Sequence, residues 1–514
     1  MDKKQLAELQ NQLALQKTGQ LAPEQAAHFA DAAAGFFMQG WLEGKEIDYG
    51  AIAIIGSLIA DDDEKISEPA TKKLFEKIIE PLMDSFLPEN RRAYDRLFIR
   101  LVDILRHSPS GRLLNDALDG MGCPTEEALL ERAGKAREAR AFFPDKKKIR
   151  KIFVLSRVTI GADIAVTSVV LKYLRSEMPD AEILFLAPKA DAAQLFSFEG
   201  VVLEDLPYPR RGPLAGRLQS WISCVELMER HSKGLSDSEF LIVDPDSRIT
   251  QLGLLPMPGS LQNYLFFNPS LSGTELEGGK AVSLAQAANA WLNKIFGKEK
   301  SIHPSVNVLK EDAAFARKVF DVFPLDGRQA VAIKLGVGGN DTKRVGDEFE
   351  LDLAREILKA GKAIIFDAPQ KEIESVRVDS IAAALEKEGI KVARVMDKAG
   401  QLPSVPAAKG AQVILFNRAR ADLGRFAATM ALCRQCISYN SMGQHLAGAL
   451  GLDVVAIFAG CQSEHFTARW KPSGKGSIRV VSAGNGPFSS RQQKDILRDT
   501  MGKYGEICLD GRIR

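Results

Sequence analysis

Short apolar runs that alternate with helical patterns are the feature that most restricts how this chain can fold. Eight runs of five to eight residues begin at Lys151 and recur up to residue 458, with helical segments between most of them. Runs of this length between helices predict parallel strands buried on both faces of a sheet. There are enough of them for two sheets. The runs are KIFVLSRV (151–158), AEILFLA (181–187), EFLIVD (239–244), AVAIKL (330–335), AIIFDA (363–368), KVARV (391–395), VILFN (413–417) and VVAIF (454–458).

Residues 1–145 follow a different pattern. Apolar residues recur at helical spacing, and Pro23, Pro69, Pro88, Pro109 and Pro124 stand where a helix should start or stop. This pattern predicts five to seven helices and no strand. A chain of 514 residues is also too long for one core. We therefore expect an all-helical domain at 1–145 and two α/β domains at 146–320 and 321–514, with the divide between the sheets inside 297–328.

Composition excludes several classes of protein. The chain has 68 basic and 66 acidic residues, a formal charge of +2, which gives no case for a nucleic-acid-binding protein. Six cysteines do not make a disulfide scaffold, so a reduced cytoplasmic setting fits best. No run of about 18 apolar residues predicts a membrane span. The basic run KKKIRK (146–151) is read as a solvated linker, and peripheral contact with the inner membrane stays open.

In open α/β sheets, ligands bind beyond the carboxyl ends of the strands, so motifs there carry the most weight. The first motif is RVTIGADIAVTS (157–168), where Gly161 permits a tight turn and Asp163 falls near the start of a helix. Asp is a preferred helix N-cap and needs no further role. The same carboxylate, facing a cleft, is also a candidate general base.

The second motif, VDPDSRITQLGLLP (243–256), follows another buried strand. Asp244, Asp246 and Arg248 either pair with one another and shape a polar wall, or bind an acceptor substrate through Asp246 and Arg248. The residues alone leave both readings open.

The third motif is KLGVGGNDTKRVG (334–346). Gly336, Gly338 and Gly339 let the backbone approach a phosphate closely. Lys343 can neutralise a diphosphate as a point charge, and Arg344 can bind it bidentately. Two cations beside a glycine cluster at a sheet edge favour phosphate binding.

The fourth motif, SYNSMGQHLAGALG (438–451), is a polar turn that runs into a helix. Helix N-termini leave backbone N–H groups unpaired and carry partial positive charge, so they suit a phosphate. We expect a nucleotide diphosphate to bind here. The residues that would contact this donor are Asn440, Ser441, Met442, Gly443, Gln444 and His445.

The fifth motif is CRQC (433–436), with Cys461 and His465 further along. A CxxC pair suggests a metal or redox site. No second CxxC is present and Cys436 enters a predicted buried strand, so inert buried cysteines are the favoured interpretation.

Three of these motifs, in this order, resemble the heptosyltransferase family of glycosyltransferases, whose GT-B fold has two facing Rossmann-like domains. The stretch IGADIAVTSVVLKYLRSEMPDAEI is similar to the family's first loop and helix, GGNDTKRVGDEFELDLAREIL to its donor loop, and NSMGQHLAGALG to its late motif. The resemblance covers about 150–505. Asn440 replaces the family's aspartate, Met442 replaces a glycine, and Ala162 is an extra residue before Asp163.

The resemblance implies inverting sugar transfer that needs neither a metal nor a cofactor. Asp163 would deprotonate the acceptor hydroxyl, while Lys343, Arg344, the glycine-loop amides and the helix start would stabilise the leaving diphosphate. The implied donor is ADP-heptose or a related nucleotide sugar, and the acceptor is a glycan or protein hydroxyl.

Two alternatives remain. One is a GT-B enzyme that acts on another nucleotide sugar, either as an epimerase or as a transferase. The other is a catalytically silent sugar-nucleotide-binding or scaffold protein. In either case the helical domain at 1–145 would serve for docking a protein partner or for homo-oligomerisation.

Overall fold

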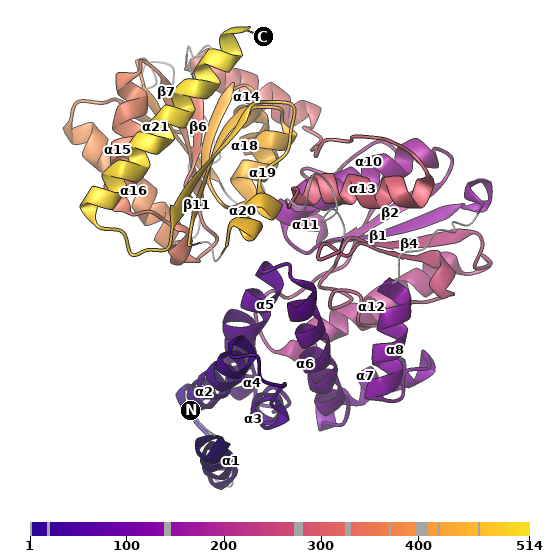
Figure 1. The fold of residues 1–514 in the computed structure, drawn as a ribbon. Helices are drawn as coiled ribbons and strands as arrows, with labels where there is room; N and C mark the ends of the chain where they lie inside the picture. The colour runs from indigo at the N-terminus through magenta and orange to yellow at the C-terminus, as the bar shows by residue number, and fades with distance from the viewer. Residues whose placement is uncertain are drawn as a thin grey trace.

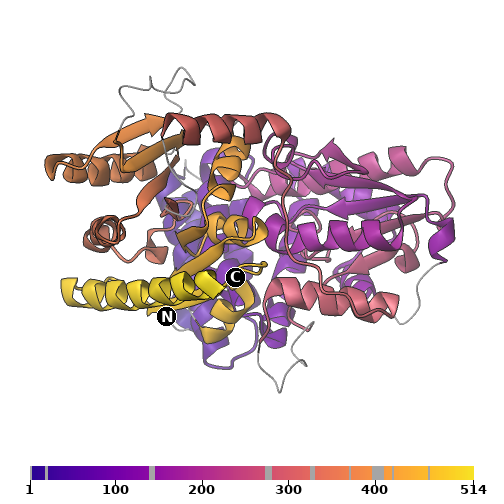
Figure 2. The ribbon, with the colours of Figure 1, turned by 90° about the horizontal axis from the view of Figure 1, so that it is seen from above.

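The computed structural model describes residues 3–17, 21–137, 145–271, 281–323, 330–369, 372–395, 410–418, 422–460 and 463–513. Figure 1 shows a helical part in indigo and purple, a first α/β part in magenta and a second in orange and yellow. Figure 2 shows the two α/β parts side by side, with the helical part behind them. This is the expected fold class, two α/β units with parallel sheets preceded by a helical unit.

The helical part holds no strand among the described residues up to 137. Pro23 and Pro88 occupy the first position of their helices, where a missing N–H costs nothing. Pro69 was expected to mark a boundary, but it lies inside a helix. The helices are α1 (Lys3–Lys17), α2 (Pro23–Leu42), α3 (Tyr49–Ile59), α4 (Glu64–Leu74), α5 (Glu80–Asp84), α6 (Pro88–Arg106), α7 (Arg112–Gly120) and α8 (Glu126–Arg137), and a π-turn at Phe75–Ile79 joins α4 to α5.

The first sheet has five parallel strands in the order β3-β2-β1-β4-β5. The chain runs outward from β1 in one direction and then returns to build β4 on its other side, so the strand order reverses between β1 and β4. The strands are β1 (Lys151–Leu155), β2 (Glu182–Ala187), β3 (Val201–Asp205), β4 (Phe240–Asp244) and β5 (Tyr264–Phe266). The helices are α9 (Ile160–Ala162), α10 (Ser168–Glu177), α11 (Lys189–Ala192), α12 (Leu214–Ser232) and α13 (Leu284–Phe296).

The second sheet has seven parallel strands in the order β12-β11-β10-β6-β7-β9-β8, and its order reverses between β6 and β10. The strands are β6 (Ala330–Lys334), β7 (Ala363–Pro369), β8 (Val392–Val395), β9 (Val413–Arg418), β10 (Gln435–Tyr439), β11 (Asp453–Ala459) and β12 (Ile478–Gly484). The helices are α14 (Lys310–Val322), α15 (Asp347–Lys359), α16 (Glu372–Lys387), α18 (Leu423–Ala431), α19 (Met442–Ala449), α20 (Glu464–Trp470) and α21 (Ser490–Ile513).

All eight apolar runs contain strands, a ninth strand, β10, lies where Cys436 was expected to enter one, and three further strands were not predicted. Edge strand β3 is half-exposed, β5 has only three residues, and edge strand β12 is mostly half-exposed. Strands of these kinds lack the continuous apolar run by which a buried parallel strand is recognised.

The helical part shares one hydrophobic core with the first sheet. Alternate residues of β1 face opposite sides. Phe153 and Leu155 belong to the same cluster as Leu58 and Leu101 of the helical part, whereas Val154 faces the other side. The helical part is therefore packed against the sheet itself and is more than a unit tethered by a linker. No helix in the described part of the chain is long and apolar enough to cross a membrane.

Candidate functional site

A cavity of about 690 Å³ opens between the two sheets. Most of its wall comes from the points where each sheet reverses its strand order, the loops after β1, β6 and β10, and α5, α16, α18, α20 and the loop after β3 add the remaining residues. Ligands of open α/β sheets bind at such points because adjacent loops diverge there. We call it the first cavity. Its lining residues are Asp84, Thr159, Ile160, Gly161, Ala162, Arg210, Lys334, Gly336, Val337, Gly338, Lys343, Glu374, Leu423, Asn440, Ser441, Met442, His445, Phe466 and Trp470.

The junction of β10 and α19 presents unpaired polar groups to this cavity. Ser441 is the N-cap residue of α19, and its side chain makes no capping hydrogen bond. Ser441 Oγ and Asn440 Nδ2 are both buried without a hydrogen-bond partner. Buried polar groups without partners are rare in folded proteins. Together with the free amides of the helix start, they form a ready site for an anion.

His445 lies in the first turn of α19 and contributes to the same wall. Its ring packs edge-on against Trp470, with the ring centroids 5.8 Å apart. Burial, followed by the nearby charge of Lys343, lowers the pKa of His445 to about 4. The imidazole is therefore neutral at physiological pH, so it serves as a hydrogen-bonding group and adds no positive charge.

The glycine loop after β6 is held by a carboxylate that the sequence did not reveal. Glu374 Oε1, at the start of α16, accepts hydrogen bonds from the amides of Val337 at 3.0 Å and Gly338 at 2.8 Å. The glycine-loop amides were expected to stabilise a diphosphate, and the structure corrects this for Gly338, whose amide is already bonded to Glu374. Gly336 is needed for space, since a Cβ there would lie 2.9 Å from Glu374 Oε2.

Two lysines give the cavity positive charge. Lys334 ends β6 and pairs with Asp367, with Nζ and Oδ2 2.9 Å apart. Lys343 has no carboxylate within 4 Å in the described part of the chain. Its positive charge acts to lower the pKa of both Asp84 and His445. Lys343 is therefore a cation available to a ligand, and Arg210 also lines the cavity.

The structure places four of the predicted donor residues outside the cavity lining. Arg344 turns away, because its Nε pairs with buried Glu350 at 2.8 Å and its guanidinium also contacts Asp347. Gln444 is fully buried and donates to Asn440 Oδ1 at 3.0 Å and to the Trp470 carbonyl at 3.1 Å. Gly339 and Gly443 also lie outside the lining.

These two glycines have separate backbone reasons. A Cβ on Gly443 would lie 2.4 Å from Lys334 Cδ, so the small residue lets α19 approach β6. Gly339 has a φ of +91°, which side-chain-bearing residues rarely adopt. The predicted residues that do line the cavity are Gly336, Gly338, Lys343, Asn440, Ser441, Met442 and His445.

Asp163 is also outside the lining, one turn into the helix that begins at Ile160, so it is not the helix N-cap either. Its side chain is 3% exposed. It accepts hydrogen bonds from Ser156 Oγ at 2.6 Å, the Arg157 amide at 2.7 Å and Thr167 Oγ1 at 2.7 Å. Burial raises its pKa to about 6 despite these bonds. In this conformation Asp163 holds the turn after β1 and does not face the cavity.

Asp84, the last residue of α5, is the carboxylate that the helical part adds to the site. It lines the first cavity and also a second cavity of about 240 Å³ next to it. Burial raises the pKa of Asp84 to about 6, against the opposing charges of Lys343 and Arg248. No motif identified Asp84, because its position depends on packing between distant segments.

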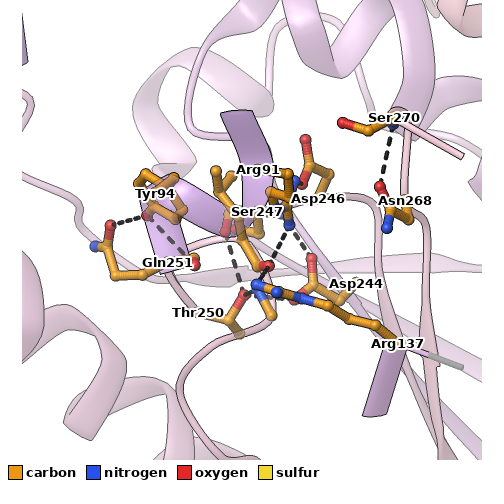
Figure 3. Close-up of polar contacts among 12 residues, drawn as sticks. Arg91, Tyr94, Arg137, Asp244, Asp246, Ser247, Thr250, Gln251, Asn268 and Ser270 are labelled. Atoms are coloured by element: carbon orange, nitrogen blue, oxygen red, sulfur yellow. Dashed lines mark hydrogen bonds and ion pairs between the residues drawn. The ribbon is translucent and has the colours of Figure 1, made fainter. Parts of the chain in front are cut away.

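The loop after β4 is fixed by residues from the helical part (Figure 3). Arg91 Nη1 donates to Asp246 Oδ1 at 3.0 Å, and Tyr94 Oη donates to the Gln251 carbonyl at 3.4 Å. The buried Asp244 carboxylate accepts from the Ser247 amide at 2.6 Å and also from Thr250 Oγ1 and Tyr264 Oη.

Of the two readings that the sequence left open, mutual pairing of Asp244, Asp246 and Arg248 does not occur in the structure. Asp246 pairs with Arg91 and, at 3.3 Å, with Arg157. Arg248 lines the second cavity instead.

The described cysteines are free, and Cys433 and Cys436 are buried. Burial raises the thiol pKa of both, that of Cys436 to about 12, so they are inert toward deprotonation. Cys461 lies outside the described residues. Among the described residues, no group of three or more His, Cys, Asp or Glu side chains is arranged to hold a metal ion.

No protein-family model and no curated protein matches this chain, whereas solved structures do. The family 9 glycosyltransferase from Veillonella parvula is 15% identical with a TM-score of 0.45, over 66% of this chain and 87% of that one. The E. coli ADP-heptose lipopolysaccharide heptosyltransferase II is 16% identical with a TM-score of 0.46, over 70% and 99%. The E. coli heptosyltransferase WaaC with ADP is 13% identical with a TM-score of 0.43, over 68% and 99%.

In fold, this chain is similar to heptosyltransferases. The likeness is distant, and it assigns no role to any residue.

Proposed function

We propose that this protein is a glycosyltransferase that binds a nucleotide-diphosphate sugar in the first cavity and an acceptor hydroxyl in the second. The observation that carries this proposal is that the two cavities are adjacent and share part of their lining. Asp84, Thr159, Ala162, Arg210 and Trp470 line both of them. A donor and an acceptor bound there would meet at this shared wall, with a carboxylate beside the point of contact.

The donor diphosphate would lie between Lys343 and the start of α19. Lys343 supplies a full positive charge, and the free amides of α19 supply partial charge. Asn440 Nδ2 and Ser441 Oγ would gain the hydrogen-bond partners that they lack. These groups stabilise the charge that grows on the leaving diphosphate, which is the usual source of most of the rate enhancement.

The reaction would be a single displacement at the anomeric carbon. The acceptor oxygen forms a bond to the anomeric carbon. At the same time the bond between that carbon and the diphosphate oxygen breaks, and the electron pair of the broken bond leaves with the nucleotide diphosphate. A carboxylate takes the hydroxyl proton. Attack from the face opposite the leaving group inverts the configuration, and the charge on the leaving group is balanced by Lys343 and helix amides without a metal.

Two carboxylates are candidates for the base. Asp84 lines both cavities, and a pKa of about 6 suits proton transfer near neutral pH. Asp163 is implied by the family resemblance and has a similarly raised pKa, but it must exchange one of its three hydrogen bonds to reach a hydroxyl. The geometry favours Asp84 as the base and Asp163 as the residue that holds the loop.

A heptosyl donor carried by ADP rests on the family resemblance, as does a glycan or protein acceptor. The test is intact-mass analysis of candidate acceptors after incubation with a panel of ADP- and UDP-sugars, with titration of ADP and UDP by calorimetry. Mass gain from one sugar supports the transferase. Nucleotide binding without transfer to any acceptor would favour the silent sugar-nucleotide-binding protein, and the absence of nucleotide binding would overturn the donor site.

A further inference from the structure

The second cavity carries more positive charge than its own carboxylates neutralise. It lies where the π-turn before α5 meets the loops after β1 and β4. Arginines form much of its wall: Arg157, Arg210, Arg217 and Arg248. The carboxylates of the same wall are Glu80, Asp84 and Asp246. Asp246 is already paired with Arg157 and with Arg91 from outside the cavity.

Arg217 and Arg248 have no carboxylate within 4 Å in the described part of the chain. Arg217 is only 7% exposed. Its pKa is lowered, first by burial and also by the like charge of Arg248. Unpaired buried charge is costly for a folded protein, so such an arrangement calls for a counter-charge.

Three of these arginines each have one buried side-chain nitrogen without a hydrogen-bond partner. Arg157 Nε, Arg217 Nε and Arg248 Nη1 are buried and make no hydrogen bond. Aromatic rings hold the guanidiniums in place without neutralising them. Arg217 lies over Phe75 at 3.9 Å from the ring centroid, and Arg248 lies 5.8 Å from the centroids of both Phe75 and Tyr94.

Several residues with strained backbone conformations line the same cavity. Phe86, Val158, Asp246 and Leu252 have positive φ angles, and all four line it. For a β-branched residue such as Val158, with a φ of 58°, this conformation is a genuine outlier. Strain of this kind persists where surrounding structure enforces it and is concentrated at ligand sites.

We propose that Arg217 and Arg248, with Arg157, form an anion-binding subsite that takes a phosphate or carboxylate group carried by the acceptor. Guanidinium groups bind both oxyanions through paired N–H donors. A volume of about 240 Å³ equals roughly eight water volumes, which leaves room for a sugar unit beside the anion. The proposal rests on the proposed function, and it names the acceptor as anionic.

The test measures binding of inorganic phosphate, glucose 6-phosphate and uncharged glucose by calorimetry at low salt. A Lys343→Gln background weakens phosphate binding at the first cavity. We expect Arg217→Gln and Arg248→Gln each to weaken binding of phosphate and glucose 6-phosphate at least about ten-fold. The matched control Arg92→Gln, an exposed arginine on α6, should leave the affinity unchanged.

The three ligands distinguish an anionic group carried by the acceptor from free phosphate. Glucose 6-phosphate that binds at least as tightly as phosphate, with glucose not binding, supports an acceptor-borne group. Phosphate that binds while glucose 6-phosphate does not would overturn the acceptor assignment in favour of a free-phosphate site. Equal affinities in the wild type and both glutamine variants, or no phosphate binding at all, would overturn the subsite.

Thermal unfolding distinguishes this role from a structural one. In the Lys343→Gln background, phosphate should raise the melting temperature of the protein with both arginines and not that of the Arg217→Gln and Arg248→Gln variants, which should be as stable as it without phosphate. The proposal would be contradicted if the glutamine variants melted at a much lower temperature without phosphate and their melting temperature still rose with phosphate as much as that of the protein with both arginines. Titration of ADP into the wild type reports on the donor site separately, so failure there leaves the phosphate result readable.

Discussion

Gly161 lies directly against Met442, since a Cβ atom built on Gly161 would lie 3.1 Å from Met442 Cα. Gly161 belongs to α9, after β1, and Met442 is the first residue of α19, after β10. The two sheets therefore touch through the loops that line the first cavity. The absence of a side chain at 161 lets these backbones come this close.

Gly161→Val should reduce transferase activity without unfolding either sheet. The Cβ of a branched side chain would lie 3.1 Å from Met442 Cα, closer than side chains normally pack, so we expect the two α/β parts to shift apart and the donor and acceptor walls to move with them. We expect kcat/KM to fall by about 100-fold, since small misplacements at a reacting centre cost this much. Steady-state kinetics with circular dichroism measures both effects.

Gly35→Ala in α2 is the matched control, because a Cβ at that position meets nothing within 4 Å. It should keep full activity. Wild-type kcat/KM in Gly161→Val would show that close approach at Met442 is not needed for transfer.

Asp84→Asn should lower kcat by about 10²- to 10⁴-fold if Asp84 is the base. In the wild type, kcat/KM should fall as the pH drops below about 6, because the raised pKa leaves the carboxyl protonated there. This limb should disappear from the residual activity of the variant. Glu76→Gln, an exposed carboxylate in the turn before α5, is the control.

Asp163→Asn should cost less than ten-fold in activity, because an amide can still accept from the Arg157 N–H. Asp163→Ala leaves that buried N–H without a partner and should lower the free energy of unfolding by about 1–3 kcal/mol. Since both carboxyls have a pKa of about 6, pH profiles alone do not separate them. A large loss in Asp163→Asn with little effect in Asp84→Asn would assign the base to Asp163.

Neighbouring residues Lys343 and Arg344 should respond differently to the same substitution. Lys343→Met removes a cation that lines the first cavity and should weaken ADP binding by about 10- to 100-fold, measured by calorimetry. Arg344→Met should leave ADP binding nearly unchanged. The substitution leaves the buried carboxylate of Glu350 without its charged partner. It should therefore lower the free energy of unfolding by about 3–5 kcal/mol, measured by denaturant titration. Equal loss of ADP affinity in both variants would place Arg344 at the ligand after all.

The sequence indicates where the site lies better than which atoms face it. The apolar runs predict parallel sheets, and carboxyl-end motifs then converge because β1 and β4, and β6 and β10, are neighbours. Arg344 could not be told from Lys343 by sequence, because what turns it away is Glu350, six residues on and one helical turn into α15. Such partners depend on local backbone geometry that spacing does not fix.

Asp84 shows the other limit of prediction from sequence. It precedes the first sheet by more than sixty residues, in a segment whose pattern indicates only helices. A π-turn at Phe75–Ile79 joins α4 to α5, and packing of the helical part on the first sheet brings this carboxylate to the cavity. Neither the turn nor the docking has a signature in residue types.

His445 should make stability depend on pH with a definite sign. Its pKa is lowered to about 4 in the folded protein, against about 6.5 when exposed. Between about pH 6.5 and 4 the imidazole is therefore protonated in the unfolded chain and neutral in the folded protein. The free energy of unfolding decreases as the pH falls through this range. The full loss is about 3 kcal/mol, at about 1.4 kcal/mol per pKa unit.

The raised pKa values of Asp84, Asp163 and Asp244 act in the opposite sense, since protonation below about pH 6 relieves their buried charge. The contribution of His445 must therefore be read as a difference between wild type and His445→Gln, which cannot titrate. The variant should gain stability relative to the wild type as the pH drops from 7 to 4, in denaturant titrations at each pH. Parallel curves for the two proteins would mean that His445 is as free to take up a proton when folded as when unfolded, and the neutral hydrogen-bonding role assigned to it would fail.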